Sequence, residues 1–357
     1  MFQRHQTRPL KVNNVPVGGG APVSIQSMTN TVTADAAGTL AQIRELAAAG
    51  CEIIRVAVPD SGAVEALPAI LAGSPIPVIA DIHFDYRLAL GAIAAGIHGI
   101  RINPGNIGDV DKVRLIAEKA GEAGIPIRVG ANSGSLSEEM RLLPPADALV
   151  ESALAQCRIL EGYGFRNIKV SLKASNVPVT VAAYEKFAAR CDYPLHLGIT
   201  EAGTPQSGIV KSSVGIGALL LRGLGDTIRV SLTAPPLAEI APARRILEAA
   251  GLREASPEIV SCPTCGRTRI DLIELAERVE NLVQEIKQQN RRIKLKKIAV
   301  MGCVVNGPGE ARDADLGVAG GNNRLALFRH GEIIGTFAEA EGYELLRQEI
   351  LNHTEEL

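Results

Sequence analysis

Apolar and polar positions alternate in two ways along residues 23–250. Short runs rich in β-branched residues predict strands, and the stretches between them space their apolar residues as one face of a helix does. The predicted strands are residues 23–28, 52–58, 77–82, 99–102, 125–130, 168–173, 194–200 and 227–233. Predicted helices include residues 34–49, 62–71, 109–121, 146–162, 179–190 and 237–250. Because the strands are apolar on both faces and alternate with helices, the pattern indicates a parallel sheet.

Eight strand–helix units of this kind predict a closed (β/α)8 TIM barrel. A doubly wound open sheet is the competing architecture, but it would need a glycine-rich dinucleotide-binding turn after the first strand. The segment from Gln26 to Thr31 contains no glycine, so the barrel is favoured. A short hairpin is predicted before the barrel, with strands at residues 10–12 and 15–17.

The alternation ends after Gly251, and Ala255-Ser-Pro257 has the composition of a linker. Residues 291–297 are predicted as a basic turn. The other elements predicted beyond the linker are strands at residues 258–261, 298–301, 316–319 and 325–329, and helices at residues 271–289 and 339–351. We therefore expect two domains, a substrate-binding barrel over residues 1–254 and a smaller α+β domain over residues 255–357.

Composition narrows the classes of function. Of the 357 residues, 46% are hydrophobic and 21% are charged, as in an ordinary globular protein. The chain has no run of about 18 apolar residues that would span a membrane, and its first residues lack the apolar region of a signal peptide. A net charge of −2 argues against nucleic-acid binding. Six cysteines without an export signal indicate the reducing cytoplasm, where thiols bind metal or stay free.

Three of the cysteines gather in the last third of the chain, as Cys262-Pro-Thr-Cys265 and Cys303. Structural zinc sites usually have four ligands, so three thiolates better suit an iron–sulfur cluster with one non-cysteine position. Glu310, on the Gly/Pro-rich segment after Cys303, is the nearest carboxylate. Zinc and purely structural cysteines remain the alternatives. Lone cysteines in apolar or helical stretches are predicted to be small buried hydrophobes, and these are Cys51, Cys157 and Cys191.

Polar residues lie near the predicted strand ends, where enzymes of this fold carry their active sites. Five of them are cations, which are costly in apolar strands unless they meet water or an anion: Arg55, Arg101, Arg128, Lys173 and Arg229. Together they predict a ligand with a diphosphate or two phosphates, since arginine suits bidentate contact with phosphate. An ion-paired structural role is the alternative for each cation taken singly. The other polar residues at these ends are Asp81, His83, Asn103, Asn132, Thr200, Glu201 and Ser231.

The segment from Ser207 to Gly217 combines small residues and hydroxyls before an apolar stretch, residues 218–224, that is predicted as a helix. Ser212 or Ser213 is predicted as the N-cap, so that the free N–H groups of the helix would face an anion. A glycine-rich hinge is the alternative. Asp81 and Glu201 lie among cations and are expected to be ionised partners by default, because an acid catalyst would need a raised pKa.

The motifs around these residues are long and specific. In the predicted barrel they are Val23-Ser-Ile-Gln-Ser-Met-Thr29, Ile79-Ala-Asp-Ile-His-Phe84, Arg101-Ile-Asn-Pro-Gly-Asn-Ile107, Arg128-Val-Gly-Ala-Asn-Ser-Gly-Ser-Leu136, Lys169-Val-Ser-Leu-Lys-Ala-Ser175, Gly198-Ile-Thr-Glu-Ala-Gly203 and Lys211-Ser-Ser-Val-Gly-Ile-Gly217. In the second domain they are Cys262-Pro-Thr-Cys-Gly-Arg267 and Met301-Gly-Cys-Val-Val-Asn-Gly-Pro-Gly-Glu310. From end to end, the chain resembles the bacterial 4-hydroxy-3-methylbut-2-enyl diphosphate synthases of the non-mevalonate isoprenoid pathway, in their short form.

The resemblance implies a [4Fe–4S] cluster in the second domain, held by Cys262, Cys265, Cys303 and Glu310. It implies two-electron reductive ring opening and dehydration of 2-C-methyl-D-erythritol 2,4-cyclodiphosphate to (E)-4-hydroxy-3-methylbut-2-enyl diphosphate. Glu201 would deliver a proton to the departing hydroxyl, and Asn306 would touch the substrate near the cluster. The diphosphate would be held by Arg55, Arg101, Arg128, Lys173, Arg229 and Ser231, with Ser212 or Ser213 nearby, and the barrel mouth would be lined by Asp81, His83, Asn103, Asn132 and Thr200.

The resemblance also implies partners. Electrons would come singly from a reduced flavodoxin or ferredoxin, and in a homodimer the cluster domain of one subunit would close over the barrel of the other. Two other functions remain open, a zinc-dependent barrel enzyme acting on a phosphorylated small molecule and a non-enzymatic cluster-bearing redox sensor. A sensor would have no use for five converging cations.

Overall fold

The computed structural model describes the chain except for residues 1–2, 108–109, 254–256, 290, 304–311 and 357. The chain divides into two compact units, Met1–Arg253 and Glu254–Leu357. No helix among the described residues is both long enough and apolar enough to cross a membrane.

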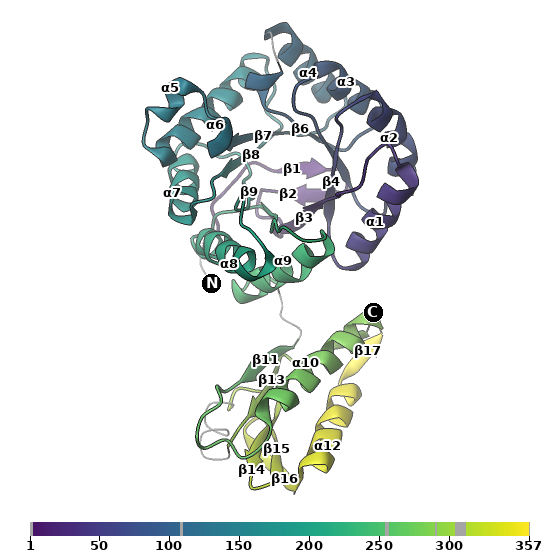
Figure 1. Cartoon of the computed structure of the whole chain (residues 1–357), viewed down its shortest axis with the longest axis vertical. Helices are drawn as coiled ribbons and strands as arrows, with labels where there is room; N and C mark the ends of the chain where they lie inside the picture. The colour runs from purple at the N-terminus through teal and green to yellow at the C-terminus, as the bar shows by residue number, and fades with distance from the viewer. Residues whose placement is uncertain (1–2, 108–109, 254–256, 290, 304–311, 357) are drawn as a thin grey trace. The chain divides into compact units, whose positions relative to one another are not determined.

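An eight-stranded parallel sheet forms the centre of the first unit (Figure 1). In the order β8-β7-β6-β5-β4-β3-β10-β9, its strands are Ile168–Lys173, Ile127–Asn132, Ile100–Arg101, Val78–Asp81, Ile53–Ala57, Ser24–Met28, Thr227–Ile228 and His196–Leu197. A parallel bridge between Val170 and Leu195 joins the two ends of this order, so the sheet closes on itself. The predicted (β/α)8 barrel is confirmed.

Helices surround the sheet in a ring, which Figure 1 shows from one end. They are α1 Ala36–Ala48, α2 Ser61–Gly73, α3 Tyr86–Ala94, α4 Val110–Glu122, α5 Glu138–Arg141, α6 Pro145–Gly162, α7 Val177–Ala188, α8 Pro205–Leu221 and α9 Leu237–Ala249. Two short 3-10 turns, η1 Pro104–Asn106 and η2 Ser133–Ser135, follow β6 and β7. Asp35 and Asp60 cap α1 and α2 by accepting from backbone N–H groups in the first turn, which satisfies donors that the helix itself leaves free.

A hairpin closes one end of the barrel. Strands β1 Leu10–Val12 and β2 Val15–Val17 pair antiparallel, as the sequence predicts. Val12 and Val17 are fully buried and cluster with Ile53 and Ile79, which lie in the first halves of β4 and β5. The hairpin therefore covers the N-terminal ends of the strands, and the C-terminal ends remain as the face where this fold builds its sites.

The helix after β9 differs from its prediction. Residues 207–217 are not a loop before a helix at 218–224, because α8 runs without a break over Pro205–Leu221 with Thr204 as its N-cap. Its glycines bring the helix close to its neighbours, since a Cβ on Gly215 would lie 2.5 Å from Ile199 and one on Gly208 would lie 2.6 Å from Leu232. The small residues therefore serve close packing, and the predicted N-cap role of Ser212 or Ser213 is wrong.

The second unit is an α+β domain. Its five-stranded sheet has the order β11-β13-β14-β15-β16, with strands Glu258–Ser261, Lys297–Met301, Leu316–Gly321, Arg324–Arg329 and Glu332–Ala338. The first three strands pair in parallel and the last three antiparallel. An apolar core joins the sheet to helices α10 Leu272–Gln288 and α12 Glu339–Asn352. The predicted basic turn instead begins with a strand, β12 Arg291–Ile293, which pairs with β17 Thr354–Glu356, and neither β16 nor β17 was predicted.

Candidate active site

Three neighbouring barrel strands carry charged residues in register, at the last position of β5 and of β6 and at the second position of β7. Asp81 of β5 lies beside Arg101 of β6, and Arg101 lies beside Arg128 of β7. One strand further on, Asn132 of β7 lies beside Lys173 of β8. The parallel sheet thus brings together residues that are far apart in the sequence.

Asp81 links two of the cations through its carboxylate. Its Oδ1 accepts from Arg101 Nη1 at 3.2 Å, and its Oδ2 lies 3.6 Å from Arg55 Nε and 3.6 Å from His83 Nε2. Burial alone would raise the pKa of this carboxyl, but Arg55, His83 and Arg101 outweigh burial and hold the pKa well below its usual value. Asp81 is therefore ionised and acts as an electrostatic partner, as predicted, rather than as an acid.

Arg128 and Lys173 are buried without a carboxylate partner among the described residues. Arg128 Nε and Nη1 have no hydrogen-bond partner there. Burial lowers the pKa of both groups well below its usual value, and repulsion from the neighbouring arginines lowers it further. Lys173 is repelled by Arg128, Arg229, Arg55 and Arg101, so the five cations share one region. An anion bound in that region would relieve both the repulsion and the burial cost.

A second carboxylate, Glu239 of α9, forms an ion pair with the remaining cation, Arg229. Arg229 donates from Nε to Glu239 Oε2 at 3.3 Å and from Nη2 to Oε1 at 3.5 Å. Arg55 donates through Nε and Nη2 to the sulfur of Met28 at 3.3 and 3.0 Å, and Arg229 Nη1 reaches the same sulfur at 3.6 Å. Neither Glu239 nor Met28 is among the site residues predicted from the sequence.

The interior of the barrel beside these cations is also polar. Lys169 of β8 lies beside Arg128 in register, is fully buried and has no partner for Nζ among the described residues. Burial, with repulsion from Arg128, lowers the pKa of Lys169 to about 7. Nearby His196 of β9 hydrogen-bonds Thr227 at 2.7 Å, and burial with the surrounding cations keeps its pKa well below the usual value. His196 is therefore neutral, and Lys169 is a further ionisable residue that the sequence analysis missed.

Glu201 follows β9 in a backbone conformation that non-glycine residues rarely adopt, with φ of 52°. Its side chain is exposed, and Thr200 before it is half-buried. Such strain persists only where the surrounding structure imposes it and clusters at functional sites. Here the backbone is fixed nearby by the bond from Thr233 N–H to Gly203 O at 2.9 Å. The strain supports the predicted catalytic role of Glu201.

The other predicted contacts lie in different settings. Asn103 is buried and caps η1 through its Oδ1, which accepts from Gly105 N–H at 3.1 Å. Asn132 and Ser231 are half-buried at the ends of β7 and beyond β10. His83 is mostly exposed, with Nε2 3.1 Å from Arg101 Nη1. Asn103 thus has a local structural role, whereas His83 belongs to the Asp81 cluster.

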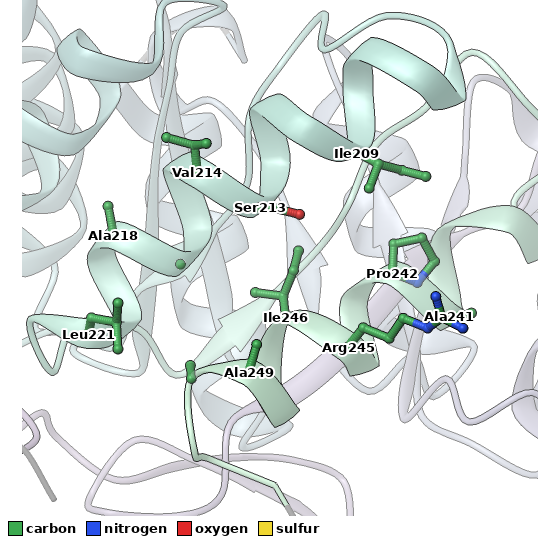
Figure 2. A pocket seen from close by; sticks show the side chains of 12 residues that line it. Ile209, Ser213, Val214, Ala218, Leu221, Ala241, Pro242, Arg245, Ile246 and Ala249 are labelled. Carbon is green, nitrogen blue, oxygen red and sulfur yellow. The ribbon is translucent and has the colours of Figure 1, made fainter. Parts of the chain in front are cut away.

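The two predicted serines of α8 face opposite ways. Ser212 is fully buried on the face of the helix that packs against the barrel, and its Oγ has no partner in the described part of the chain. Ser213 is exposed and lines an apolar groove of about 840 Å³ between α8 and α9, beside Val214 and Ile246 (Figure 2). Of the pair, only Ser212 faces the barrel.

In the second unit, two of the three predicted thiol ligands lie at the ends of paired parallel strands. Ser261 of β11 pairs with Val300 of β13, so Cys262 and Cys303 follow neighbouring strand ends. Gly302 N–H donates to Cys262 Sγ at 3.2 Å. Cys265 is exposed, and hydrogen bonds from the backbone and side chain of Arg267 lower the pKa of its thiol. N–H donors and a cation beside sulfur stabilise thiolates, which is the form that binds metal.

The chemistry of these thiol donors fits an iron–sulfur cluster, and two of them follow paired strand ends. No three Cys, His, Asp or Glu side chains converge as a metal site among the described residues. The predicted fourth ligand, Glu310, and the predicted substrate contact, Asn306, lie outside the described residues.

Comparison with known proteins identifies the chain. A model described as the GcpE TIM-barrel domain matches residues 7–244, and one described as the GcpE protein C-terminal domain matches residues 258–352. The chain belongs to the GcpE family. The resemblance found in the sequence is confirmed, and both parts of the family pattern are present in this GcpE chain.

Relatives match the GcpE chain over nearly its full length. One, from Geobacter sulfurreducens, is 56% identical over 97% of this chain and 97% of the relative. Another, from Salinispora tropica, is 54% identical over 99% of this chain and 90% of the relative. Both are named 4-hydroxy-3-methylbut-2-en-1-yl diphosphate synthase (flavodoxin).

Solved structures resemble the GcpE chain in fold. Dihydropteroate synthase from Yersinia pestis superposes with a TM-score of 0.52 at 13% identity, over 68% of this chain and 98% of that one. For 3-dehydroquinate dehydratase from Geobacillus kaustophilus the TM-score is 0.53 at 16% identity, over 71% of this chain and 100% of that one. Both support the barrel fold alone.

Proposed function

We propose that the chain catalyses the reaction of its relatives, the conversion of 2-C-methyl-D-erythritol 2,4-cyclodiphosphate to (E)-4-hydroxy-3-methylbut-2-enyl diphosphate, as an oxidoreductase of isoprenoid biosynthesis. Family membership over both parts of the chain supports this activity. The observation that carries the assignment of the site is the group of five cations with only two carboxylates, Asp81 and Glu239, paired to them among the described residues. A cyclic diphosphate supplies the missing negative charge.

In this proposal the barrel binds and orients the substrate. Arg128 and Lys173, which have no carboxylate partner in the described ranges, contact the phosphates most directly. Arg55, Arg101 and Arg229 are held by Met28, Asp81 and Glu239 and present fixed N–H groups, so little side-chain freedom is lost on binding. Ser212 and Ser231, with His83, Asn132 and Thr200, complete the contacts around the diphosphate and the carbon skeleton.

A [4Fe–4S] cluster, when bound, supplies the two electrons one at a time. Cys262, Cys265 and Cys303 would hold it with Glu310, and Asn306 would contact the substrate. In the overall reaction, the ring C–O bond to phosphate breaks and one hydroxyl leaves as water. Glu201 is the group that gives a proton to this departing hydroxyl, and its unusual backbone conformation after β9 supports a functional role. A carboxylate is a harder ligand than thiolate, so Glu310 suits the position that a substrate oxygen could take.

The electron donor in this proposal is a reduced flavodoxin, as the names of the relatives state, or a ferredoxin. We further propose a homodimer in which the cluster domain of one subunit serves the barrel of the other. A mixed dimer of a Cys265→Ser chain and a Glu201→Ala chain would then keep about one working site in two. Complete inactivity of the purified mixed dimer would contradict this arrangement.

The decisive experiment combines a metal assay with turnover. Anaerobically purified protein should contain about four iron and four sulfide per chain, and with a reduced flavodoxin it should convert the cyclodiphosphate to the linear diphosphate. Zinc without sulfide would replace this proposal with a zinc-dependent barrel enzyme. A cluster without affinity for the cyclodiphosphate would replace it with a redox sensor.

A further inference from the structure

One buried carboxylate, outside the residues that the motifs indicate, connects helix α9 to two separate parts of the barrel mouth. Glu239, in the first turn of α9, is only 3% exposed. Its Oε2 accepts from Ser27 Oγ of β3 at 3.1 Å and from Arg229 Nε at 3.3 Å. Its Oε1 accepts from Leu232 N–H at 3.1 Å and from Arg229 Nη2 at 3.5 Å. Four donors therefore surround a single carboxylate.

These contacts fix both the direction of Arg229 and the path of the chain after β10. Two N–H groups on one edge of the guanidinium point to Glu239, and Nη1 lies 3.6 Å from Met28 Sδ. Nη1 and Nη2 each carry a second N–H, which can donate to a phosphate oxygen. The hydrogen bond from Leu232 N–H to Glu239 fixes the short segment after Arg229, which includes Ser231. One carboxylate thus orients two of the proposed substrate contacts.

We propose that Glu239 is a positioning residue for the diphosphate of the substrate, acting through Arg229 and the segment from Arg229 to Leu232. The inference rests on the proposed function, because it concerns the same substrate. The side chain of an unrestrained arginine loses rotational freedom when its guanidinium group binds an anion. Glu239 removes most of that freedom before binding, and because its side chain is buried, solvent does not weaken its hold on Arg229.

The chain offers a matched control in Glu52. Its Oε2 accepts from Ile25 N–H at 2.7 Å and from Arg253 Nη2 at 2.5 Å, so it too joins an arginine to a backbone N–H of the barrel. Glu52 directly precedes β4, at the end of the barrel that the hairpin covers. A Glu→Gln change there removes the same kind of interaction far from the cations.

The test measures the dissociation constant for 2-C-methyl-D-erythritol 2,4-cyclodiphosphate by calorimetry on the cluster-loaded full chain, together with kcat, KM and the melting temperature. In Glu239→Gln the amide NH₂ would face an N–H donor, so we expect binding to weaken about 10-fold or more, with KM raised and kcat changed less. Glu239→Asp keeps the charge and should bind within about threefold of the wild type. Glu52→Gln should leave binding unchanged.

A double-mutant cycle separates positioning from general stability. In an Arg229→Ala background, Glu239→Gln should change affinity by at most about threefold, well below its effect in the wild type, because only its hold on the segment that carries Ser231 remains. Equal losses in both backgrounds, or unchanged binding by Glu239→Gln, would overturn the inference while leaving the proposed function intact. If Glu239→Gln fails to fold, Glu239→Ala, which removes the acceptor without placing an NH₂ group against a donor, replaces it in the same cycle with the same expected and contradicting outcomes. A wild-type chain that does not bind the cyclodiphosphate would overturn the proposed function and this inference with it.

Discussion

The barrel mouth and the thiol-bearing strand ends of the second unit are both built from paired parallel strands. They differ in how deeply their functional side chains are buried. In both, parallel strands bring together residues distant in sequence, Asp81 with Arg101 and Arg128 in the barrel, and Cys262 with the residues after β13 in the second unit. The barrel buries its charged groups and connects them through Asp81, Met28 and Glu239. Cys265 is exposed, and Cys262 and Cys303 are half-buried.

The cysteines of the two units show how this difference in burial affects the pKa of a thiol. Burial raises the pKa of the Cys51 thiol to about 12, and it also raises that of Cys157, so both stay protonated inside the barrel unit. The thiol of Cys265 has a lowered pKa because Arg267 donates to it. The prediction that Cys51 and Cys157 are buried is confirmed, while Cys191 is half-buried. In the proposed function, the barrel thus offers the diphosphate a preformed group of fixed charges, whereas the thiols of the second unit would be ordered by the metal that they are proposed to bind.

The largest effect should come from removing a proposed cluster ligand. In Cys265→Ser, we expect iron and acid-labile sulfide to fall sharply and turnover to drop to background, because the electrons lose their route to the substrate. The dissociation constant for the cyclodiphosphate should change little if the barrel alone supplies the phosphate contacts. Cys191→Ser, on the barrel, is the control and should keep its iron and its activity. A Cys265→Ser protein with full iron and sulfide would show that Cys265 is not a ligand.

The second-largest effect should come from the free-energy cost of burying the charged amino group of Lys169 in the barrel. The folded-state pKa of Lys169 is about 7, whereas its ordinary value is 10.5. Below pH 7 both folded and unfolded states carry the proton, and the full penalty applies. Between pH 7 and 10 the unfolded state binds more protons, so the free energy of unfolding should rise with pH. One pKa unit corresponds to about 1.4 kcal/mol, so the penalty near pH 6 is roughly 5 kcal/mol.

Lys169→Met should remove this penalty. Its advantage over the wild type in urea unfolding, followed by circular dichroism of the barrel transition, should be large at pH 6 and shrink towards pH 10. The exposed Lys11 of β1 supplies the control, Lys11→Met, for which we expect no such pH-dependent difference. A stability difference that does not vary with pH would mean that Lys169 keeps its proton, which requires a partner for its Nζ.

The anion site can be tested at a cation that has no carboxylate partner in the part of the chain described here. Lys173→Met should weaken cyclodiphosphate binding about 100-fold, because a charge-assisted hydrogen bond in a buried site contributes up to about 3 kcal/mol. Iron and sulfide content should stay at the wild-type level. Lys186→Met is the matched control, since Lys186 forms an exposed 2.6 Å ion pair with Asp147 on the outer helices. Equal affinity of wild type and Lys173→Met would remove Lys173 from the site.

Much of the barrel and its mouth could be predicted because strand periodicity identifies the strand ends, and this fold places its sites there. Glu239 was missed for a physical reason. Its position within an amphipathic helix is typical of a surface residue, and its burial depends on contact with Ser27, 212 positions away in the sequence. Lys169 could have been found, since it shares the inward-facing alternation of β8 with Lys173. The α8 error arose because glycines that permit close packing look like a loop in sequence.

The smallest predicted effect tests the fit around the preformed cations. Gly198 directly follows β9, and a Cβ on it would lie 2.8 Å from Lys173 Nζ and 2.8 Å from the backbone oxygen of Arg229. The lysine can swing aside, but the backbone carbonyl moves only with the whole β10 segment. We therefore expect Gly198→Ala to raise KM and the dissociation constant about 10-fold, as a displacement of about 1 Å in a positioned site can do.

Gly217→Ala, on α8, is the control for this substitution, because a Cβ there meets no atom within 4 Å. It should leave binding unchanged and stabilise the helix by about 0.5–1 kcal/mol. If Gly198→Ala bound the cyclodiphosphate as tightly as the wild type, the mouth would tolerate displacement of two of its cations. The barrel mouth would then be no more rigid a site than the thiols of the second unit.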